Sequence, residues 1–458
     1  MLRERAVGLP QVLFQSVTHM APAATVAFAL LISVPYAGPA LPLSVLVALI
    51  ACLCVASSIG QLAKEVPSAG GLYSYVSRAL GPKPGFLTGW ALLLFQPLVA
   101  PGIVLVFAAT TQDVMQHDVG WSYGGQWWIW VLVAMAIVSA LSYRDVRLST
   151  NAGIVLGAFE IAVFTALALW MIVAHADQST LQVFNPAHAT GGALEGTFKG
   201  AVFAILAFIG FEAAAPLGEE ARRPDRTVPR AVVLSALAIG AFYLLTSYAW
   251  VVGTGFDRFV AVTGDPANAD PWRRLATIFW GSAWVLIFVA ILNSSLASAN
   301  AGVTGVSRVL YAMGRSGMLP RALARTHPVR QVPHVAILAE NVFALAVALG
   351  AGWAWGPRNG FAILATAATI MVILVYIAVC VATIVFYRRR PERRFLLHVV
   401  CPLLGIAALV GPLYYQYHPL PPYPLRIANW VALAWPVGGL VALFWTARRR
   451  PEALAPVS

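Results

Sequence analysis

Two glutamates, Glu160 and Glu212, stand within long apolar stretches of this 458-residue sequence. A carboxylate at the centre of a bilayer costs at least about 2.5 kcal/mol by insertion scales, so each needs a partner or a function. Glu212 closely follows Gly210, where glycine lets a chain leave helical geometry. A carboxylate beside free backbone carbonyls would attract an amine or a proton. The alternative is that Glu212 only caps the irregular backbone around it.

Glu160 lies near the centre of another apolar stretch. A carboxylate there is suited to taking up and releasing a proton, to coordinating a cation, or only to bonding a neighbouring helix. Three serines, Ser294, Ser295 and Ser298, lie in a third stretch. Small polar residues commonly hold membrane helices together, and their oxygens also suit a hard cation. His19 belongs to a residue type that titrates near neutrality, but a lone histidine more often packs or hydrogen-bonds.

Two of the apolar stretches carry residues that interrupt a helix. Pro22 lies near the middle of the first, and Gly210 lies within the sixth. Proline removes a backbone donor and clashes with the preceding turn. A pair of interrupted segments in corresponding places of two halves is the best sequence indication of a transporter's substrate site. The candidate substrate-binding residues are therefore Met20, Ala21, Pro22, Ala23, Ala24 and Thr25 in the first break and Phe208, Ile209, Gly210, Phe211 and Glu212 in the second.

The composition places these stretches in a membrane. Of the residues, 60% are hydrophobic and 10% are charged, whereas a soluble chain carries about 25% charged residues. One crossing of the bilayer needs roughly 20 apolar residues of helix. We predict an all-α polytopic membrane protein with 12 transmembrane helices, at roughly 13–36, 41–64, 84–111, 127–144, 150–175, 197–220, 228–253, 274–303, 333–352, 357–387, 395–417 and 427–447.

The basic residues fix an orientation for these helices. If the N-terminus is cytoplasmic, 24 of the 30 Lys and Arg residues fall on the cytoplasmic side, as the positive-inside rule requires. Both termini are then cytoplasmic, in segments 1–12 and 448–458. The bias also accounts for the net charge of +12 without a nucleic-acid partner.

Three ordered stretches resemble motifs of the amino acid–polyamine–organocation (APC) transporters. The first is Pro-Ser-Ala-Gly-Gly-Leu-Tyr-Ser-Tyr at 67–75, after the second predicted helix. The second is Phe-Ile-Gly-Phe-Glu at 208–212, which runs on to Pro-Arg-Ala at 229–231. The third, 307–320, begins Ser-Arg-Val-Leu-Tyr-Ala-Met-Gly-Arg. Their order, and their places on predicted cytoplasmic edges or in broken helices, make the resemblance specific.

The resemblance implies a LeuT-like fold of two inverted five-helix repeats. The transporter core would cover 13–387, with repeats at about 13–175 and 197–387, and helices 11 and 12 would be appended at 388–447. The first and sixth helices would be broken and would hold substrate between them. Members that bind α-amino acids usually have a glycine-rich first break, whereas the first break here contains no glycine.

The resemblance also implies roles for single residues. Glu212 matches a glutamate that links the site to the cytoplasmic gate, and Phe208 and Phe211 would close over a substrate. Some relatives carry a lysine near the position of Glu160, where sodium binds in sodium-coupled members. Hydroxyls in the eighth helix, here Ser294, Ser295 and Ser298, face the first helix and complete a sodium site. On residue types alone, cytoplasmic salt bridges are expected among Glu219, Glu220 and Asp225 and the basic residues Arg222, Arg223, Arg226 and Arg230, unless this loop is merely solvated.

We therefore expect a secondary transporter that imports amino acids or related amines by alternating access, coupled to protons or to sodium. The alternatives within transport are a substrate exchanger and a polyamine or organocation transporter. An amine-sensing receptor or a channel is the alternative of a different class. Neither an enzyme nor a cofactor is expected, because no zinc-protease, nucleophile-elbow or P-loop motif occurs. The expected partners are the lipid bilayer and the small-molecule substrate, and the expected location is a bacterial inner membrane.

Overall fold

The computed structural model describes residues 6–121, 126–143, 146–264 and 270–449, which form helices and short connections with no β-strand among them. The helices are α1 Leu9–His19, α2 Pro22–Ala24, α3 Leu30–Ala37, α4 Leu41–Glu65, α5 Leu72–Leu80, α6 Pro82–Phe95, α7 Val99–His117, α8 Trp127–Ser142, α9 Val146–Ala174, α10 Ala193–Phe208, α11 Pro224–Thr254, α12 Phe259–Gly264, α13 Pro271–Trp280, α14 Val285–Arg315, α15 His334–Tyr387, α16 Cys401–Tyr417 and α17 Arg426–Arg449.

Nine stretches of the described chain are long and apolar enough to cross a bilayer, which confirms the predicted all-α membrane class. The two longest are Leu9–Glu65 with 57 residues and His334–Tyr387 with 54 residues. Each exceeds one crossing, because about 20 residues of helix span the hydrocarbon core. Each also contains a glycine with positive φ at which the chain changes direction, Gly38 at 53° and Gly356 at 78°.

The first predicted helix is interrupted where the sequence indicated. α1 ends at His19, Ala21 adopts a left-handed conformation with φ 47° and ψ 61°, and Pro22 begins α2. A π-helical turn, Thr25–Ala29, then leads into α3. The left-handed conformation costs a residue with a side chain roughly 1–2 kcal/mol. The break therefore forms without the glycine that is usual in the similar transporters.

The sixth predicted helix is also interrupted as predicted. α10 ends at Phe208, Ile209 is extended, and Gly210 has a φ of 124° that favours glycine. The chain continues as a 3-10 helix, Phe211–Leu217. A seven-residue 3-10 segment is long for this conformation, in which hydrogen-bond geometry is poorer than in an α-helix.

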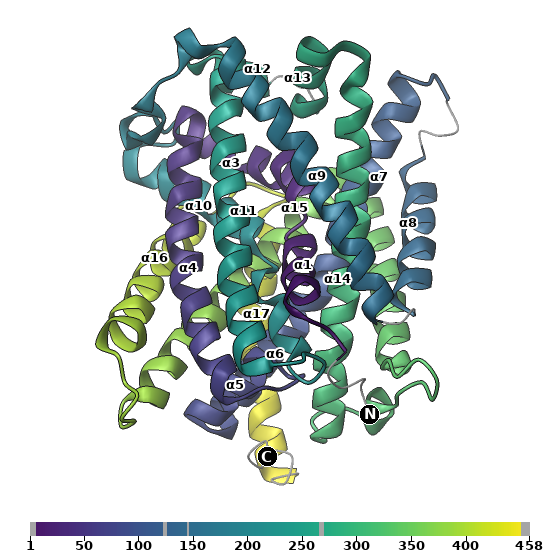
Figure 1. The fold of residues 1–458 in the computed structure, drawn as a ribbon, viewed down its shortest axis with the longest axis vertical. Coiled ribbons are helices and arrows are strands. Elements are labelled where there is room, and N and C mark those ends of the chain that lie inside the picture. Colours follow the sequence, from purple (N-terminus) through teal and green to yellow (C-terminus); the bar gives the residue numbers. More distant parts are fainter. Residues whose placement is uncertain (1–5, 122–125, 144–145, 265–269, 450–458) are drawn as a thin grey trace.

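The two broken segments lie at the centre of the bundle. α1 packs against α9, α11 and α14, while α10 packs against α3 and α4. α16 packs against α4 and α10 and lies at the edge of the bundle, and α17 packs against α6 and α15 (Figure 1). The first turns of α1 and the last turns of α17 lie toward one end of the molecule, and α12 and α13 lie at the other (Figure 1).

The predicted terminal segments are only partly described. Residues 1–5 and 450–458, which make up much of the predicted segments 1–12 and 448–458, lie outside the described residues. α1 begins at Leu9 rather than at residue 13, because Pro10 suits a first helical turn and the Gln11 side chain accepts the Gly8 amide hydrogen at 3.1 Å.

Candidate functional site

The two helix breaks are in direct contact. A Cβ atom placed on Gly210 would lie 2.7 Å from the Met20 amide nitrogen and 2.8 Å from the His19 carbonyl carbon. Real Cβ atoms essentially never come so close to other heavy atoms, so the backbone of the first break rests on the glycine of the second. Glycine is therefore required here both for its φ and for its lack of a side chain.

Ser16 joins the two broken segments by hydrogen bonds. Its hydroxyl donates to the Phe211 carbonyl oxygen at 2.8 Å and accepts from the Ala214 amide at 3.0 Å. Both bonds reach from α1 to the 3-10 segment after the second break. They satisfy backbone groups that the interruption of a helix leaves without intrahelical partners.

Buried hydroxyls also satisfy the carbonyl groups of the first break. The His19 carbonyl accepts from Ser298 Oγ in α14 at 2.8 Å. The Met20 carbonyl accepts from Thr25 Oγ1 at 2.8 Å and from the Tyr243 hydroxyl of α11 at 2.9 Å. Because these carbonyl oxygens already accept hydrogen bonds, the first break is held in place and does not present unpaired backbone acceptors.

Glu160 of α9 contacts the backbone of the first break. It is fully buried, and its Oε2 atom accepts from the Ala23 amide at 3.4 Å. The Ser294 hydroxyl faces the same carboxyl group. Neither Glu160 Oε1 nor Ser294 Oγ completes a hydrogen bond of ordinary geometry with any part of the chain that the structure describes. A buried carboxyl oxygen and a buried hydroxyl are thus available for a proton or a cation.

The other two serines of this group have different surroundings. Ser295 Oγ donates to the Ile291 carbonyl of its own helix at 2.9 Å. Ser298 bonds to the first break, as described above. Of the three predicted ion-site serines, the structure therefore brings only Ser294 to the Glu160 carboxyl group.

Glu212 is held within the second break. Its Oε2 atom accepts from the Gly210 amide at 3.1 Å and from the Tyr376 hydroxyl of α15 at 2.8 Å. Two pairs of aromatic rings pack beside the same break. The ring centroids of Phe211 and Tyr376 are 5.3 Å apart, and those of Phe208 and Tyr243 are 5.4 Å apart. The carboxylate thus ties the irregular backbone to α15.

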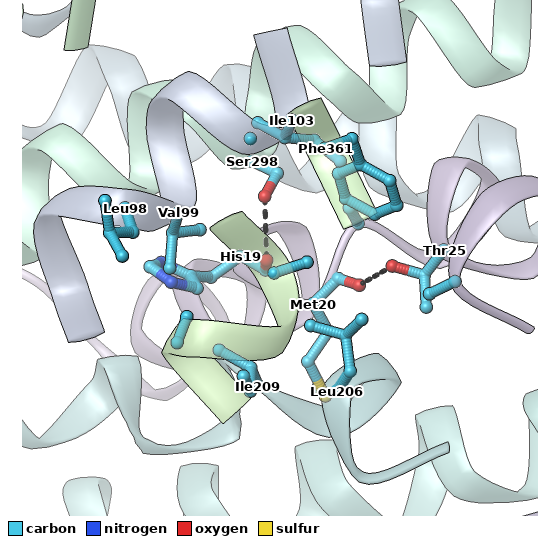
Figure 2. A pocket seen from close by; sticks show the side chains of 15 residues that line it. His19, Met20, Thr25, Leu98, Val99, Ile103, Leu206, Ile209, Ser298 and Phe361 are labelled. Carbon is cyan, nitrogen blue, oxygen red and sulfur yellow. Dashed lines mark hydrogen bonds between the residues drawn. The ribbon is translucent and has the colours of Figure 1, made fainter. Parts of the chain in front are cut away.

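A cavity of about 50 Å³ lies beside the two breaks. Figure 2 shows His19, Leu98 and Val99 on one side of it and Thr25 on the other. Of the predicted substrate-binding residues, Met20, Ala21, Thr25 and Ile209 line the cavity. The others are set back from it, namely Pro22, Ala23, Ala24, Phe208, Gly210, Phe211 and Glu212.

Two walls of the cavity come from helices that the sequence did not indicate as part of the site. One wall is the 98–103 segment, where the 3-10 turn Gln96–Leu98 separates α6 from α7. Pro97 and Pro101 in this segment resemble the breaking residues of the first helix and were the available signal. The other wall is a stripe on α15, Phe361, Ala365 and Ala368, whose spacing places these side chains on one face.

Charged groups close the bundle at one end of the breaks. Arg308 of α14 makes a bidentate bond to Glu220, with Nε–Oε2 at 2.6 Å and Nη2–Oε1 at 3.2 Å, and both side chains are buried. Glu219 pairs with Arg315 at 2.7 Å and accepts from the Ala69 amide at 3.2 Å.

This network corrects the predicted salt bridges. The basic residues expected to pair with Glu219 and Glu220 were those of the following loop, but both partners come from α14 instead. In the first turn of α11, Arg226 approaches Asp225 at 3.7 Å, and both side chains are exposed. Sequence proximity favoured the basic residues that follow Glu220. The actual pairs form because the 307–320 stretch packs beside Glu219 and Glu220.

Charges also gather at the other end of the bundle. Arg273 of α13 pairs with Asp113 of α7 at 3.1 Å and with Asp118. Arg358, next to the kink of α15, lies 3.9 Å from Asp113. These ion pairs connect α7, α13 and α15 on the side of the breaks away from Glu220.

Comparison with known proteins places the chain in a family. A family model described as amino acid permease matches residues 8–451. The chain belongs to this family. The match includes both helix breaks and the Glu220–Arg308 pair, so the site described above lies within the part that the permease shares with its family.

Individual relatives of the permease are also named as transport proteins. The low-affinity putrescine importer PlaP of Escherichia coli K12 is 29% identical over 65% of this chain and 64% of its own length. The branched-chain amino acid permease BcaP of Bacillus subtilis is 26% identical over 66% of this chain and 65% of its length. An uncharacterised transporter of Mycobacterium tuberculosis is 30% identical over 70% of this chain and 69% of its own length. The chain thus aligns with just under two thirds of the first two relatives.

Proposed function

We propose that this permease is a secondary active transporter that imports amino acids or related amines by alternating access. The observation that carries the proposal is the contact of Gly210 with the His19–Met20 backbone beside a buried cavity. Two interrupted membrane helices that meet at a cavity are the arrangement in which many transporters hold substrate. The putrescine importer and the branched-chain permease among its relatives support both substrate classes.

The proposed topology has twelve crossings. Division of the two longest apolar stretches at their glycine turns raises the nine stretches to eleven, and the shorter apolar helix Trp127–Ser142 makes twelve, close to the predicted ranges. The core, 13–387, would consist of two inverted five-helix repeats, 13–175 and 197–387, with 388–447 appended. Both termini would be cytoplasmic, since 24 of the 30 basic residues then lie on that side. The bacterial relatives support a location in the inner membrane.

Alternating access requires that the two ends of the bundle open in turn. The Glu220–Arg308 and Glu219–Arg315 pairs would close the cytoplasmic end. Two backbone hydrogen bonds join Val7 to the same loop. The Val7 amide donates to the Glu220 carbonyl at 3.1 Å, and the Arg222 amide donates to the Val7 carbonyl at 3.0 Å. The Arg273–Asp113 pair would act at the outer end.

Uptake into proteoliposomes tests the proposal. The panel contains labelled amino acids and polyamines, each with and without proton and sodium gradients. We expect a gradient to drive accumulation of at least one substrate. Uptake driven only by counter-substrate would replace import by exchange, and a substrate-gated current without accumulation would indicate a channel. Binding without any transport would favour a receptor.

Glu160 is the proposed coupling group, because its free carboxyl oxygen faces Ser294 beside the first break. We expect Glu160→Gln to abolish gradient-driven accumulation while counterflow exchange of the same substrate continues, since the amide cannot release a proton or balance a cation. The measurement is accumulation against counterflow in the same proteoliposomes. Glu195→Gln, whose side chain is 43% exposed and pairs with Lys199, is the control. Proton-driven accumulation by Glu160→Gln would remove this residue as the coupling group.

Glu212 is proposed to hold the second break in its working geometry. In Glu212→Gln one carboxyl oxygen becomes an amide donor, which weakens the bonds from Gly210 and Tyr376 by about 1 kcal/mol each. We therefore expect transport to fall about 10-fold or more, and Tyr376→Phe to change it in the same direction. Initial uptake rates over a range of substrate concentrations measure the effect. Unchanged transport and substrate affinity in Glu212→Gln would show that the working geometry of the break does not depend on the charge of this residue.

A further inference from the structure

The cavity beside the two breaks is almost entirely apolar, and this property bears on the choice between substrate classes. Its polar side chains are His19, Thr25 and Ser298, and none of its lining residues is a carboxylate. On the basis of the proposed function, we infer that the permease takes neutral amino acids with small aliphatic side chains and excludes diamines, and that His19 accepts a hydrogen bond from the substrate ammonium group.

The two buried glutamates beside the breaks, Glu160 and Glu212, do not supply the negative charge that a diamine needs. Glu160 bonds the Ala23 amide behind the first break, and Glu212 bonds Gly210 and Tyr376 behind the second. Neither lines the cavity. A diamine would bring two cationic groups beside apolar walls, and burial of an unpaired ammonium is strongly unfavourable. A neutral amino acid carries its own compensating carboxylate, so it enters with no net charge.

The walls fit an aliphatic side chain. Leu98 faces it from the 3-10 turn between α6 and α7, Val99 and Ile103 face it from the first turns of α7, and Phe361 faces it from α15. Each buried methylene of a ligand gains about 0.8 kcal/mol by leaving water. The cavity of about 50 Å³ is small, whereas sites for drug-sized ligands measure roughly 300–1,000 Å³. Small aliphatic side chains therefore fit with the least movement of the walls, and aromatic ones require the most.

His19 is the one lining side chain with an unused buried polar atom. Its Nδ1 atom has no hydrogen-bond partner among the described residues, and the Ala301 carbonyl lies near the ring. A carbonyl oxygen only accepts hydrogen bonds, so we assign the ring proton to Nε2. In a neutral imidazole Nδ1 is then an acceptor, which is complementary to an ammonium N–H and not to a carboxylate.

Thr25 and Ser298 differ from His19 because their hydroxyls already make hydrogen bonds. Each hydroxyl donates to a carbonyl of the first break, Thr25 to Met20 and Ser298 to His19, as Figure 2 shows. Their protons are committed to holding the break, and only lone pairs of the hydroxyl oxygens remain. Among the lining side chains, His19 Nδ1 is the buried polar atom that has no hydrogen bond of its own within the described residues.

Competition for uptake in proteoliposomes tests the substrate class. The competitors are alanine, valine, leucine, phenylalanine, lysine and putrescine at equal concentration. We expect alanine, valine and leucine to be transported and to compete at least about 10-fold better than putrescine, since putrescine would bury a second ammonium group without a partner and one lost hydrogen bond to a charged group is already worth that factor. Preferential transport of putrescine overturns the inference and leaves the proposed transporter intact. Transport of no amine or amino acid overturns the proposed function itself.

Substitution of His19 tests its role as an acceptor. We expect His19→Leu to raise the KM for leucine at least about 10-fold with little change in maximal rate, and His19→Gln, which keeps an acceptor oxygen, to recover part of that loss. The deaminated analogue 4-methylpentanoate supplies a second readout. The wild type should prefer leucine to this analogue, and His19→Leu should lose at least about 10-fold of that preference. A proportional loss for both ligands, or a change in maximal rate alone, contradicts the ammonium contact.

Discussion

Replacement of Gly210 by alanine is expected to abolish transport. The added methyl group would lie 2.7 Å from the Met20 amide nitrogen and 2.8 Å from the His19 carbonyl carbon, which are backbone atoms of the other break. Overpacking of this kind costs about 1–3 kcal/mol, and the φ of 124° adds strain for any residue with a side chain. Because the two breaks cannot separate without altering the cavity, we expect uptake to fall about 100-fold or more.

Gly305→Ala is the matched control for this substitution. Gly305 lies within helix α14, and a methyl group there would meet no atom within 4 Å. Alanine has a higher helix propensity than glycine by about 1 kcal/mol, so this variant should be as stable as the parent and as active. Melting temperature in detergent and initial uptake rate are measured for both variants. Wild-type transport by Gly210→Ala would show that the breaks do not need this close contact.

The breaks were predictable because their causes are local. Pro22 cannot continue a helix hydrogen-bond pattern, and Gly210 can adopt a φ that other residues avoid, so sequence alone located both. Their matching positions indicated a substrate site, whereas the direct contact of the two backbones was not predicted. The conformation of Ala21 was not predictable, since an alanine with φ 47° is unfavourable by itself and persists only because the surrounding helices determine it.

The walls of the cavity show why the rest of the site could not be predicted. Phe361 and Ala365 lie in an apolar helix in which most residues look alike, and only packing decides which face meets the cavity. The same is true of Tyr376, whose hydroxyl reaches Glu212 across 164 positions of sequence. Long-range partners of this kind follow from helix arrangement. Residue type and spacing along one helix contain no information about them.

The second large effect is expected when the Glu220–Arg308 ion pair is broken. Both side chains are almost fully buried, at 1% and 3% exposed, and both carboxylate oxygens bond the guanidinium group. Removal of one partner from a buried pair leaves the other charge uncompensated and costs about 3–5 kcal/mol. We therefore expect Glu220→Gln to lower the melting temperature clearly. We also expect it to accelerate hydrogen exchange of the Val7 and Arg222 amides, which bond across the same loop.

Glu219→Gln, in the adjacent position, is the matched control. Its partner Arg315 is 52% exposed, and an exposed pair contributes only about 0–1 kcal/mol. A further variant combines Glu220→Leu with Arg308→Met, which removes both charges and restores much of the stability, because apolar residues of similar volume replace a buried pair at little cost. Faster amide exchange that persists in this double variant would assign the closure of this end to the ion pair. Equal effects of Glu219→Gln and Glu220→Gln would instead show that burial of the Glu220 charge does not determine how this end of the permease closes.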